Sequence, residues 1–257
     1  MQFIGYLFSM NKTALITGAA KRIGRSIAEH LAHQGWDVIV HYNSSGEEAD
    51  KLVDELISKY PGQRFRPVQA NLFKIEEVEN LIPKVVKKNG TFSLLINNAS
   101  VFDPANMEET SSSLLEKQIG INFKAPFLLM RDFKKYCNEG NIINITDTRI
   151  SNNRSAYAAY SLSKKVLWES TKMAALEFAP DIRVNAVAPG VTLAPAGKGD
   201  DYLWQLAQRI PMRKPGGMEP VLKSIDFILD NPYLTGHLLF ADGGENLGLS
   251  DEYSDSK

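Results

Sequence analysis

Hydrophobic and polar positions along the chain follow two periods in alternation, which predicts an α/β fold. Short apolar and β-branched runs occupy residues 13–17, 37–41, 64–69, 94–97, 141–146, 182–187 and 238–241. Several are apolar throughout, as in strands covered on both faces. Between Ala49 and Tyr60, apolar residues recur at i, i+3, i+4, i+7, i+8 and i+11, which indicates one buried helix face. The alternation predicts a Rossmann-like doubly wound three-layer sandwich with a seven-stranded parallel sheet.

Further helical patterns cover residues 25–33, 75–88, 114–134, 158–178 and 220–229. Residues 191–218 break the regularity, because they are rich in glycine, proline and charge. Long loops in compact domains often cover a binding site, so we expect a substrate lid here, with a short helix in its LWQLAQRI segment. No linker divides the chain, and residues 1–257 are predicted to form a single domain with an N-terminal extension (1–10) and a polar C-terminal tail (245–257).

Composition and charge narrow the choice of ligand. The 29 basic and 30 acidic residues almost cancel, so the chain lacks long-range attraction for nucleic acid or an anionic membrane. The first nine residues are apolar but too short for a membrane span and lack a basic signal-peptide start. Cys137 is the single cysteine, which excludes an intrachain disulfide. We expect a cytoplasmic protein that binds a small molecule, with Met10 as an alternative start to Met1.

The segment LITGAAKRIG, residues 15–24, predicts a phosphate-binding turn. Gly18 lies between the first strand and a helix, whose free N–H groups and dipole favour a phosphate. Arg22 stands where such turns usually have their middle glycine. By itself this pattern is also compatible with an ordinary strand-to-helix connection.

The second strand predicts which dinucleotide would bind. NAD sites place an acid after this strand to bind the ribose 2′-OH, but here the residues from His41 to Ser45 contain no acid, and the next one is Glu47. A 2′-phosphate would find hydrogen-bond donors instead in Asn43, Ser44 and Ser45, and positive charge in Lys21 and Arg22. These residues favour NADP(H) over NAD(H), and the alternative is a basic turn that only faces solvent.

Tyr160 and Lys164 predict acid–base chemistry. Residues four apart share one helix face, and a nearby ammonium lowers the pKa of a phenol from about 10 toward the working pH. Tyr157 is set aside, because Ser161 rather than a lysine follows it at that spacing. The alternative for the pair is a packed aromatic ring beside a surface lysine.

An ordered series of motifs resembles the short-chain dehydrogenases/reductases from about Lys12 to Gly244. The motifs are Thr17-Gly18 with Gly24, Asn97-Asn98-Ala99-Ser100, Asn122, Tyr160 with Lys164, Asn185-Ala186-Val187-Ala188-Pro189-Gly190, and Asp242-Gly243-Gly244. The resemblance implies a dinucleotide-binding catalytic domain with Tyr160 as acid, Lys164 on the nicotinamide ribose and Asn122 supporting a proton-relay water. It also implies a homotetramer that uses the helices at 114–134 and 158–178.

The same resemblance implies the residues that contact the cofactor. Asn71 stands where the family more often has aspartate. With Tyr160 and Lys164, the expected contacts are Gly18, Lys21, Arg22, Ile23, His41, Tyr42, Asn43, Ser44, Ser45, Asn71, Leu72, Asn98, Ala99, Ser100, Thr146, Pro189, Gly190, Val191 and Thr192.

Asp147 departs from the family, which usually has a serine thirteen residues before the tyrosine. A serine hydroxyl donates to a carbonyl oxygen, whereas a carboxylate only accepts and would oppose a developing alkoxide. A nitrogen heterocycle with N–H and amino donors fits better. With Arg22, the pattern resembles the pteridine reductases and the dihydromonapterin/dihydrofolate-reducing branch. That resemblance implies substrate contacts from Arg22, Ser100, Phe102, Asp147 and Tyr160.

Phe102 lies at the position where the pteridine reductases stack the pterin against the nicotinamide, although a buried core phenylalanine is the alternative. The expected function is NADPH-dependent hydride transfer to a C=N bond of dihydromonapterin, dihydrobiopterin or dihydrofolate. The alternatives are a ketone or 3-oxoacyl thioester reductase and a non-catalytic NADP(H)-sensing protein. The histidines show no metal-ligand spacing, so no metal is expected.

Overall fold

Seven parallel strands form one sheet in the order β3-β2-β1-β4-β5-β6-β7. The computed structural model describes residues 12–153, 155–194 and 197–248, so the predicted extension at 1–10, the choice between Met1 and Met10, and residues 249–257 of the tail lie outside it. The strands are β1 (Thr13–Ile16), β2 (Asp37–Tyr42), β3 (Phe65–Gln69), β4 (Leu94–Asn97), β5 (Gly140–Ile145), β6 (Ile182–Pro189) and β7 (Leu238–Ala241). The predicted Rossmann-like fold class is confirmed.

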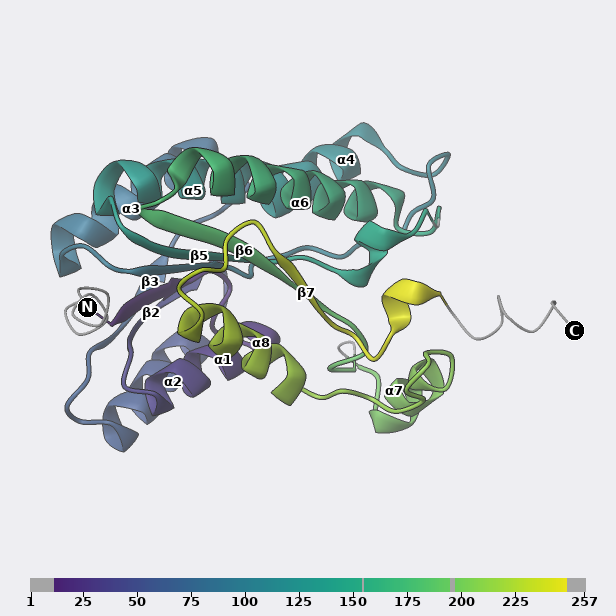
Figure 1. Cartoon of the computed structure of the whole chain (residues 1–257), viewed down its shortest axis with the longest axis horizontal. Helices are drawn as coiled ribbons and strands as arrows, with labels where there is room; N and C mark the ends of the chain where they lie inside the picture. The colour runs from purple at the N-terminus through teal and green to yellow at the C-terminus, as the bar shows by residue number, and fades with distance from the viewer. Residues whose placement is uncertain (1–11, 154, 195–196, 249–257) are drawn as a thin grey trace, which may run out of the picture.

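Helices cover both faces of the sheet, which gives the molecule three layers (Figure 1). One face carries α1 (Arg22–His33), α2 (Gly46–Lys59) and α8 (Glu219–Asp230). The other carries α3 (Ile75–Asn89), α4 (Ser112–Ile119), α5 (Ala125–Cys137) and α6 (Ala158–Phe178). The remaining helix, α7 (Asp200–Ala207), lies in the loop after β6.

The apolar runs in the strands are explained by this burial. Along β1, Leu15 packs into the core under α3 and α5, whereas Ile16 packs into the core under α1 and α2. Successive side chains of a strand point to opposite faces, so both positions must be apolar when both faces are covered. In register, Leu15 pairs with Ile39 on one side and Leu95 on the other.

The long helix predicted over residues 114–134 is wrong in one respect, because the structure divides it. A π-helical turn, Gly120–Lys124, separates α4 from α5. A Cβ at Gly120 would lie 3.0 Å from the Phe73 ring, and Asn122 within the turn is fully buried. Such insertions are frequent at functional sites, and apolar periodicity does not reveal them.

Two other helices differ from expectation at their ends. The first helix begins at Arg22 rather than at Arg25. Helix α7 begins three residues before the start of the LWQLAQRI segment and ends three residues before its end. In contrast, α6 spans the predicted residues 158–178. Among the described residues, no helix has the length and apolar character needed to cross a membrane.

Candidate active site

A cavity of about 360 Å³ opens at the carboxyl edge of the sheet. It lies between β1 and β4, where the strand order reverses, which is the usual ligand position in open α/β sheets. Four lining residues were not predicted, namely Ala20, Gly24, Val101 and Ile121. The others were all predicted as cofactor contacts: Gly18, Lys21, Arg22, Ile23, His41, Tyr42, Asn43, Ser44, Ser45, Asn71, Leu72, Asn98, Ala99 and Ser100.

The turn between β1 and α1 is held by close backbone approaches. Gly18 has a φ of +63°, and a Cβ there would lie 3.0 Å from the Ala99 Cα. A Cβ at Gly24 would lie 2.3 Å from the Gly18 carbonyl oxygen. Asn98 Nδ2 donates to the carbonyls of Thr17 (2.8 Å) and Gly18 (3.2 Å). Both glycines are therefore required by packing, which leaves the N-terminus of α1 open to the cavity.

Arg22 and Lys21 each have a partner within the protein. Arg22 has a φ of +55°, and its Nη1 donates to the carbonyl of Ala194 at 2.9 Å. This bond ties the turn to the loop that follows β6. Lys21 Nζ lies 2.6 Å from Glu48 Oε1 in an exposed ion pair. Both residues line the cavity, so their charges lie where the sequence predicts positive charge.

The ring of His41 supports the phosphate-binding turn, although the residue also lines the cavity. Its Nδ1 accepts from the Gly18 N–H at 3.0 Å, so its Nε2 carries the proton and donates to the Ala70 carbonyl at 3.1 Å. Burial lowers the pKa of His41 to about 4. The neutral imidazole therefore joins the phosphate-binding turn to the segment after β3.

The lowered pKa of His41 predicts that the protein loses stability in mild acid. His41 binds a proton near pH 6.5 in the unfolded chain but only near pH 4 in the folded chain. The contribution of neutral His41 to the free energy of unfolding is therefore fully present above pH 6.5 and is lost as the pH falls toward 4. The contribution reaches about 3 kcal/mol. His41→Asn, which keeps an acceptor for the Gly18 N–H, should lose less free energy of unfolding than the wild type between pH 7 and 4. Urea titrations at each pH measure this, and equal losses in both proteins would contradict it.

Tyr160 and Asp147 are brought together directly. The Tyr160 hydroxyl donates to Asp147 Oδ2 at 2.8 Å, and Asp147 Oδ1 accepts from the Arg149 N–H at 2.8 Å. The second bond makes Asp147 the N-cap of a short 3₁₀ helix, Thr148–Ser151. Ser100, which lines the cavity, is close enough to the Tyr160 hydroxyl to affect its pKa. The phenol and the carboxylate therefore lie beside the cavity.

The expected lowering of the Tyr160 pKa is wrong for this structure. Burial, followed by the charge and the hydrogen bond of Asp147, raises the pKa of Tyr160 well above its ordinary value. Arg149 and Ser100 partly oppose this rise. Because the pKa is raised, the phenol remains protonated at neutral pH and is suited to donating a proton.

Lys164 is buried beneath the phenol. Its Nζ donates to the Ile145 carbonyl at 2.8 Å and lies 5.8 Å from the centroid of the Tyr160 ring. Burial lowers the pKa of Lys164 to about 8, and the charge of Asp147 partly opposes this. Tyr160 and Lys164 therefore share one helix face, as their spacing requires, but the ammonium bonds to the end of β5 rather than to the phenol.

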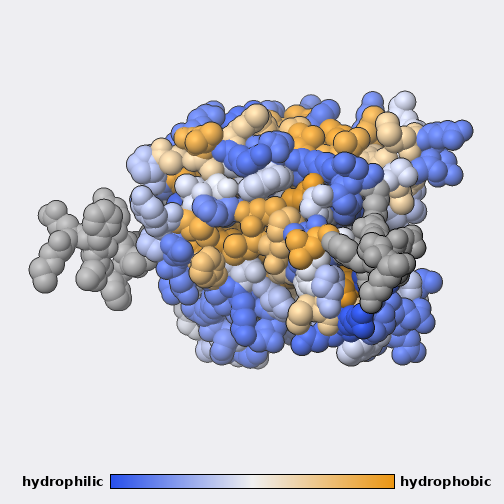
Figure 2. Space-filling model, turned by 45° about the vertical axis from the view of Figure 1, so that its right-hand side comes forward, coloured by the Kyte–Doolittle hydropathy of each residue, from blue (hydrophilic) through white to orange (hydrophobic). Residues whose placement is uncertain are grey.

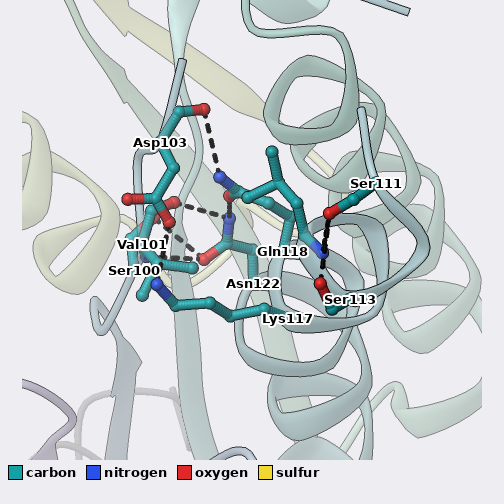
Figure 3. Close-up of polar contacts among 9 residues, drawn as sticks. Ser100, Val101, Asp103, Ser111, Ser113, Lys117, Gln118 and Asn122 are labelled. Atoms are coloured by element: carbon teal, nitrogen blue, oxygen red, sulfur yellow. Dashed lines mark hydrogen bonds and ion pairs between the residues drawn. The ribbon is translucent and has the colours of Figure 1, made fainter. Parts of the chain in front are cut away.

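Asn122 holds the loop that carries Ser100 (Figure 3). Its Oδ1 accepts from Ser100 Oγ (3.1 Å) and the Val101 N–H (2.9 Å), whereas its Nδ2 donates to the Val101 carbonyl (3.0 Å) and Ser163 Oγ (3.1 Å). These bonds link α6 and the π-helical turn to residues 100–101. They give the side chain a positioning role, and the expected proton-relay water stays a prediction.

Phe102 forms an aromatic cluster beside the phenol. Its ring stacks on that of Tyr157, with centroids 4.2 Å apart and planes at 3°, and contacts the Tyr160 ring edge-on at 4.6 Å. The Arg149 guanidinium lies over the Tyr157 ring at 4.7 Å. Phe102 is 47% exposed, so it is not a core residue. The sequence interpretation set Tyr157 aside and missed Arg149. Tyr157 precedes α6 with a φ of +61°, so helical spacing does not reveal its position beside Phe102.

The residues expected at the nicotinamide end do not line this cavity. Thr146 bonds through its hydroxyl to the Val187 carbonyl at 3.1 Å. A Cβ at Gly190 would lie 2.6 Å from the Asp242 Cα. Val191 lines a second cavity of about 230 Å³ under the loop that follows β6. With Pro189 and the buried Thr192, these residues lie at or just beyond the carboxyl ends of β5 and β6.

Comparison with known proteins places this site in a family. Residues 18–246 match the family model described as enoyl-(acyl carrier protein) reductase. The chain belongs to the short-chain dehydrogenase/reductase family. It is therefore an oxidoreductase of that family, and the match includes the cavity and the group around Tyr160.

Relatives in this family differ in their named activities. The chain is 32% identical over 243 residues to 3-oxoacyl-(acyl-carrier-protein) reductase FabG of Staphylococcus epidermidis, covering 91% of this chain and 99% of that protein. It is 30% identical over 247 residues to glucose 1-dehydrogenase 2 of Bacillus subtilis, covering 92% and 95%. Sequence similarity alone therefore does not define the substrate.

Solved structures of the family give similar folds. FolM alternative dihydrofolate reductase 1 from Brucella canis, complexed with NADP, aligns with a TM-score of 0.86 at 30% identity and covers 93% of this chain and 96% of its own. A blue fluorescent protein from a metagenomic library, in complex with NADPH, aligns with a TM-score of 0.84 at 28% identity, covering 91% and 98%.

Proposed function

We propose that the chain is an NADPH-dependent pteridine reductase that transfers hydride to a C=N bond of a dihydropterin. The observation that carries the proposal is the bond between the Tyr160 hydroxyl and Asp147 Oδ2. It puts an acceptor-only group where most family members have a hydroxyl donor. The similarity to a FolM alternative dihydrofolate reductase supports the same substrate class.

The cavity fits NADP(H). Gly18 and Gly24 keep the turn tight, because a Cβ at either would meet the backbone of Ala99 or of Gly18. The turn lines the cavity at the N-terminus of α1, where a phosphate is favoured. At the far end, Asn43, Ser44 and Ser45 supply polar groups for a 2′-phosphate. Lys21 and Arg22 add positive charge between these two regions. The solved relatives that bind NADP and NADPH support this assignment.

The protein's own residues supply geometry and a proton. NADPH, when bound, supplies the hydride. Asp147 accepts hydrogen bonds from N–H or amino groups of the heterocycle, and the protonated Tyr160 donates to the ring nitrogen that gains negative charge. Phe102 offers an exposed aromatic surface for the flat ring. Lys164, fixed by the Ile145 carbonyl, is proposed to hold the nicotinamide ribose.

A ketone or 3-oxoacyl thioester reductase is the second candidate, and the similarity to FabG supports it. The position of Asp147 opposes it, because a carboxylate beside the phenol destabilises an oxygen that becomes alkoxide-like during hydride addition. A non-catalytic NADP(H)-sensing protein would bind the cofactor and reduce nothing.

The deciding experiment follows NADPH and NADH oxidation with 7,8-dihydrobiopterin, dihydromonapterin, dihydrofolate and an acetoacetyl thioester. Turnover of the pterins with NADPH, at least about tenfold faster than with NADH or the thioester, is the expected result. Preference for the thioester would establish the second candidate. NADPH binding without any turnover would establish the sensor.

We also propose that the chain forms a homotetramer. Exposed apolar side chains lie along the helices predicted to pair, namely Leu115, Phe127, Leu162, Val166, Met173 and Leu176. A second apolar band crosses the face on which β7 and α8 lie (Figure 2), where Phe227 and Phe240 are exposed. Two such surfaces are what a tetramer of paired dimers requires. Light scattering should give a mass of about four chains, and a monomer mass would contradict the proposal.

A further inference from the structure

Arg149 is a charged group beside the reacting residues that the proposed mechanism does not use. It lies in the 3₁₀ helix that Asp147 caps, two residues after the carboxylate. Its guanidinium lies 4.7 Å from the centroid of the Tyr157 ring and 5.7 Å from that of Phe102. The cation is therefore next to the aromatic surface proposed to receive the substrate ring.

The Arg149 guanidinium lies over an aromatic ring. A cation–π contact of this kind does not use the hydrogen-bonding capacity of the guanidinium N–H groups. Among the residues that the structure describes, no side chain forms an ion pair or hydrogen bond with the Arg149 guanidinium. A half-buried arginine whose N–H groups form no such bond retains its ability to bind a carboxylate through two parallel hydrogen bonds.

Among the described residues, the neighbouring acids form no ion pair with Arg149, although Glu245 is close enough to be affected by its charge. Asp147 is bonded to the Tyr160 hydroxyl and to the main-chain N–H of Arg149. Glu245 follows β7, and its pKa is raised by burial and by the charges of Asp147 and Asp242, with Arg149 and Thr148 opposing. The carboxylate of Asp242 accepts from the N–H groups of its own turn.

We propose that Arg149 binds a carboxylate on the substituent of the pterin ring, so that the enzyme favours dihydropterins with an anionic tail over neutral ones. The inference rests on the proposed function and defines the substrate class within it. Asp147 and Phe102 hold the ring, and Arg149, adjacent to both, binds the charged end of a longer substrate. A bidentate contact to a carboxylate is specific in direction as well as in charge.

The test compares dihydrofolate, which carries carboxylates, with dihydrobiopterin, which carries none. In Arg149→Met the ratio of kcat/KM for dihydrofolate to that for dihydrobiopterin should fall about 10- to 100-fold, because a charge-assisted hydrogen-bonded contact is lost. Most of the fall should come from a higher KM for dihydrofolate. Arg149→Lys, which keeps the charge without the bidentate geometry, should recover part of the ratio.

Lys165→Met is the matched control. Lys165 lies on α6, and its Nζ donates to Oδ1 of Asn153, which precedes that helix. Lys165→Met therefore changes the net charge by the same amount as Arg149→Met and should leave the ratio as in the wild type. If Arg149→Met lowers kcat/KM for both substrates by the same factor, or Lys165→Met changes the ratio as much, the inference is overturned while the proposed function stands. If the wild type reduces neither pterin, the proposed function fails and the inference falls with it.

Discussion

Replacement of Tyr160 by phenylalanine should lower kcat for dihydropterin reduction about 1,000-fold and change KM for the pterin only slightly. General acid catalysis contributes about 10²–10⁴-fold to enzymatic rates, and Tyr160 is a buried side-chain hydroxyl that donates to Asp147 at 2.8 Å. Phenylalanine keeps the edge-on contact with the Phe102 ring, so the loss reports the hydroxyl alone. Steady-state kinetics with NADPH measure it.

Tyr157→Phe is the control for this experiment. Tyr157 stacks on Phe102, and its replacement removes a hydroxyl from the same aromatic cluster without touching the bond to Asp147. It should retain kcat within about threefold, since small effects are expected for groups outside the proton transfer. If kcat falls as much in Tyr157→Phe as in Tyr160→Phe, Tyr160 is not the general acid.

Replacement of Asp147 by serine should exchange one substrate class for another. Dihydropterin turnover should fall about 100-fold, because the acceptor for ring N–H groups is lost. Turnover of an acetoacetyl thioester or ketone should be retained or increase, because serine restores a donor to the carbonyl oxygen. Both rates are read from NADPH oxidation, and retained pterin turnover in Asp147→Ser would remove the main support for the pterin assignment.

Asp147→Asn removes the negative charge and the acceptor atom that face Tyr160. Asparagine has one acceptor oxygen, which can keep the bond from the Arg149 N–H, and its amide nitrogen, which only donates, then faces the Tyr160 hydroxyl. The negative charge of Asp147 is one cause of the raised pKa of Tyr160, so this variant should lower that pKa. Alkaline titration of tyrosinate absorbance detects the change, with Tyr160→Phe identifying the relevant tyrosine. An unchanged titration would show that burial alone sets the pKa.

The sequence alone was sufficient for the layers and for much of the site. Apolar runs such as the one through Leu15 and Ile16 predict strands covered on both faces, because one side chain must enter each core. The turn at Gly18 and the pair Tyr160 and Lys164 were also predictable, since each depends on short-range geometry: a tight turn before a helix, and residues four apart on one face.

Only the tertiary structure decided contacts that join distant segments. Arg22 bonds to Ala194, His41 bonds to the Gly18 turn, and Tyr157 stacks on Phe102. The direction of the Tyr160 pKa also depends on burial and on Asp147, thirteen residues away. Local periodicity determines which face of an element is buried, but partners and electrostatic environment depend on how the elements pack, and a one-dimensional pattern does not contain that information.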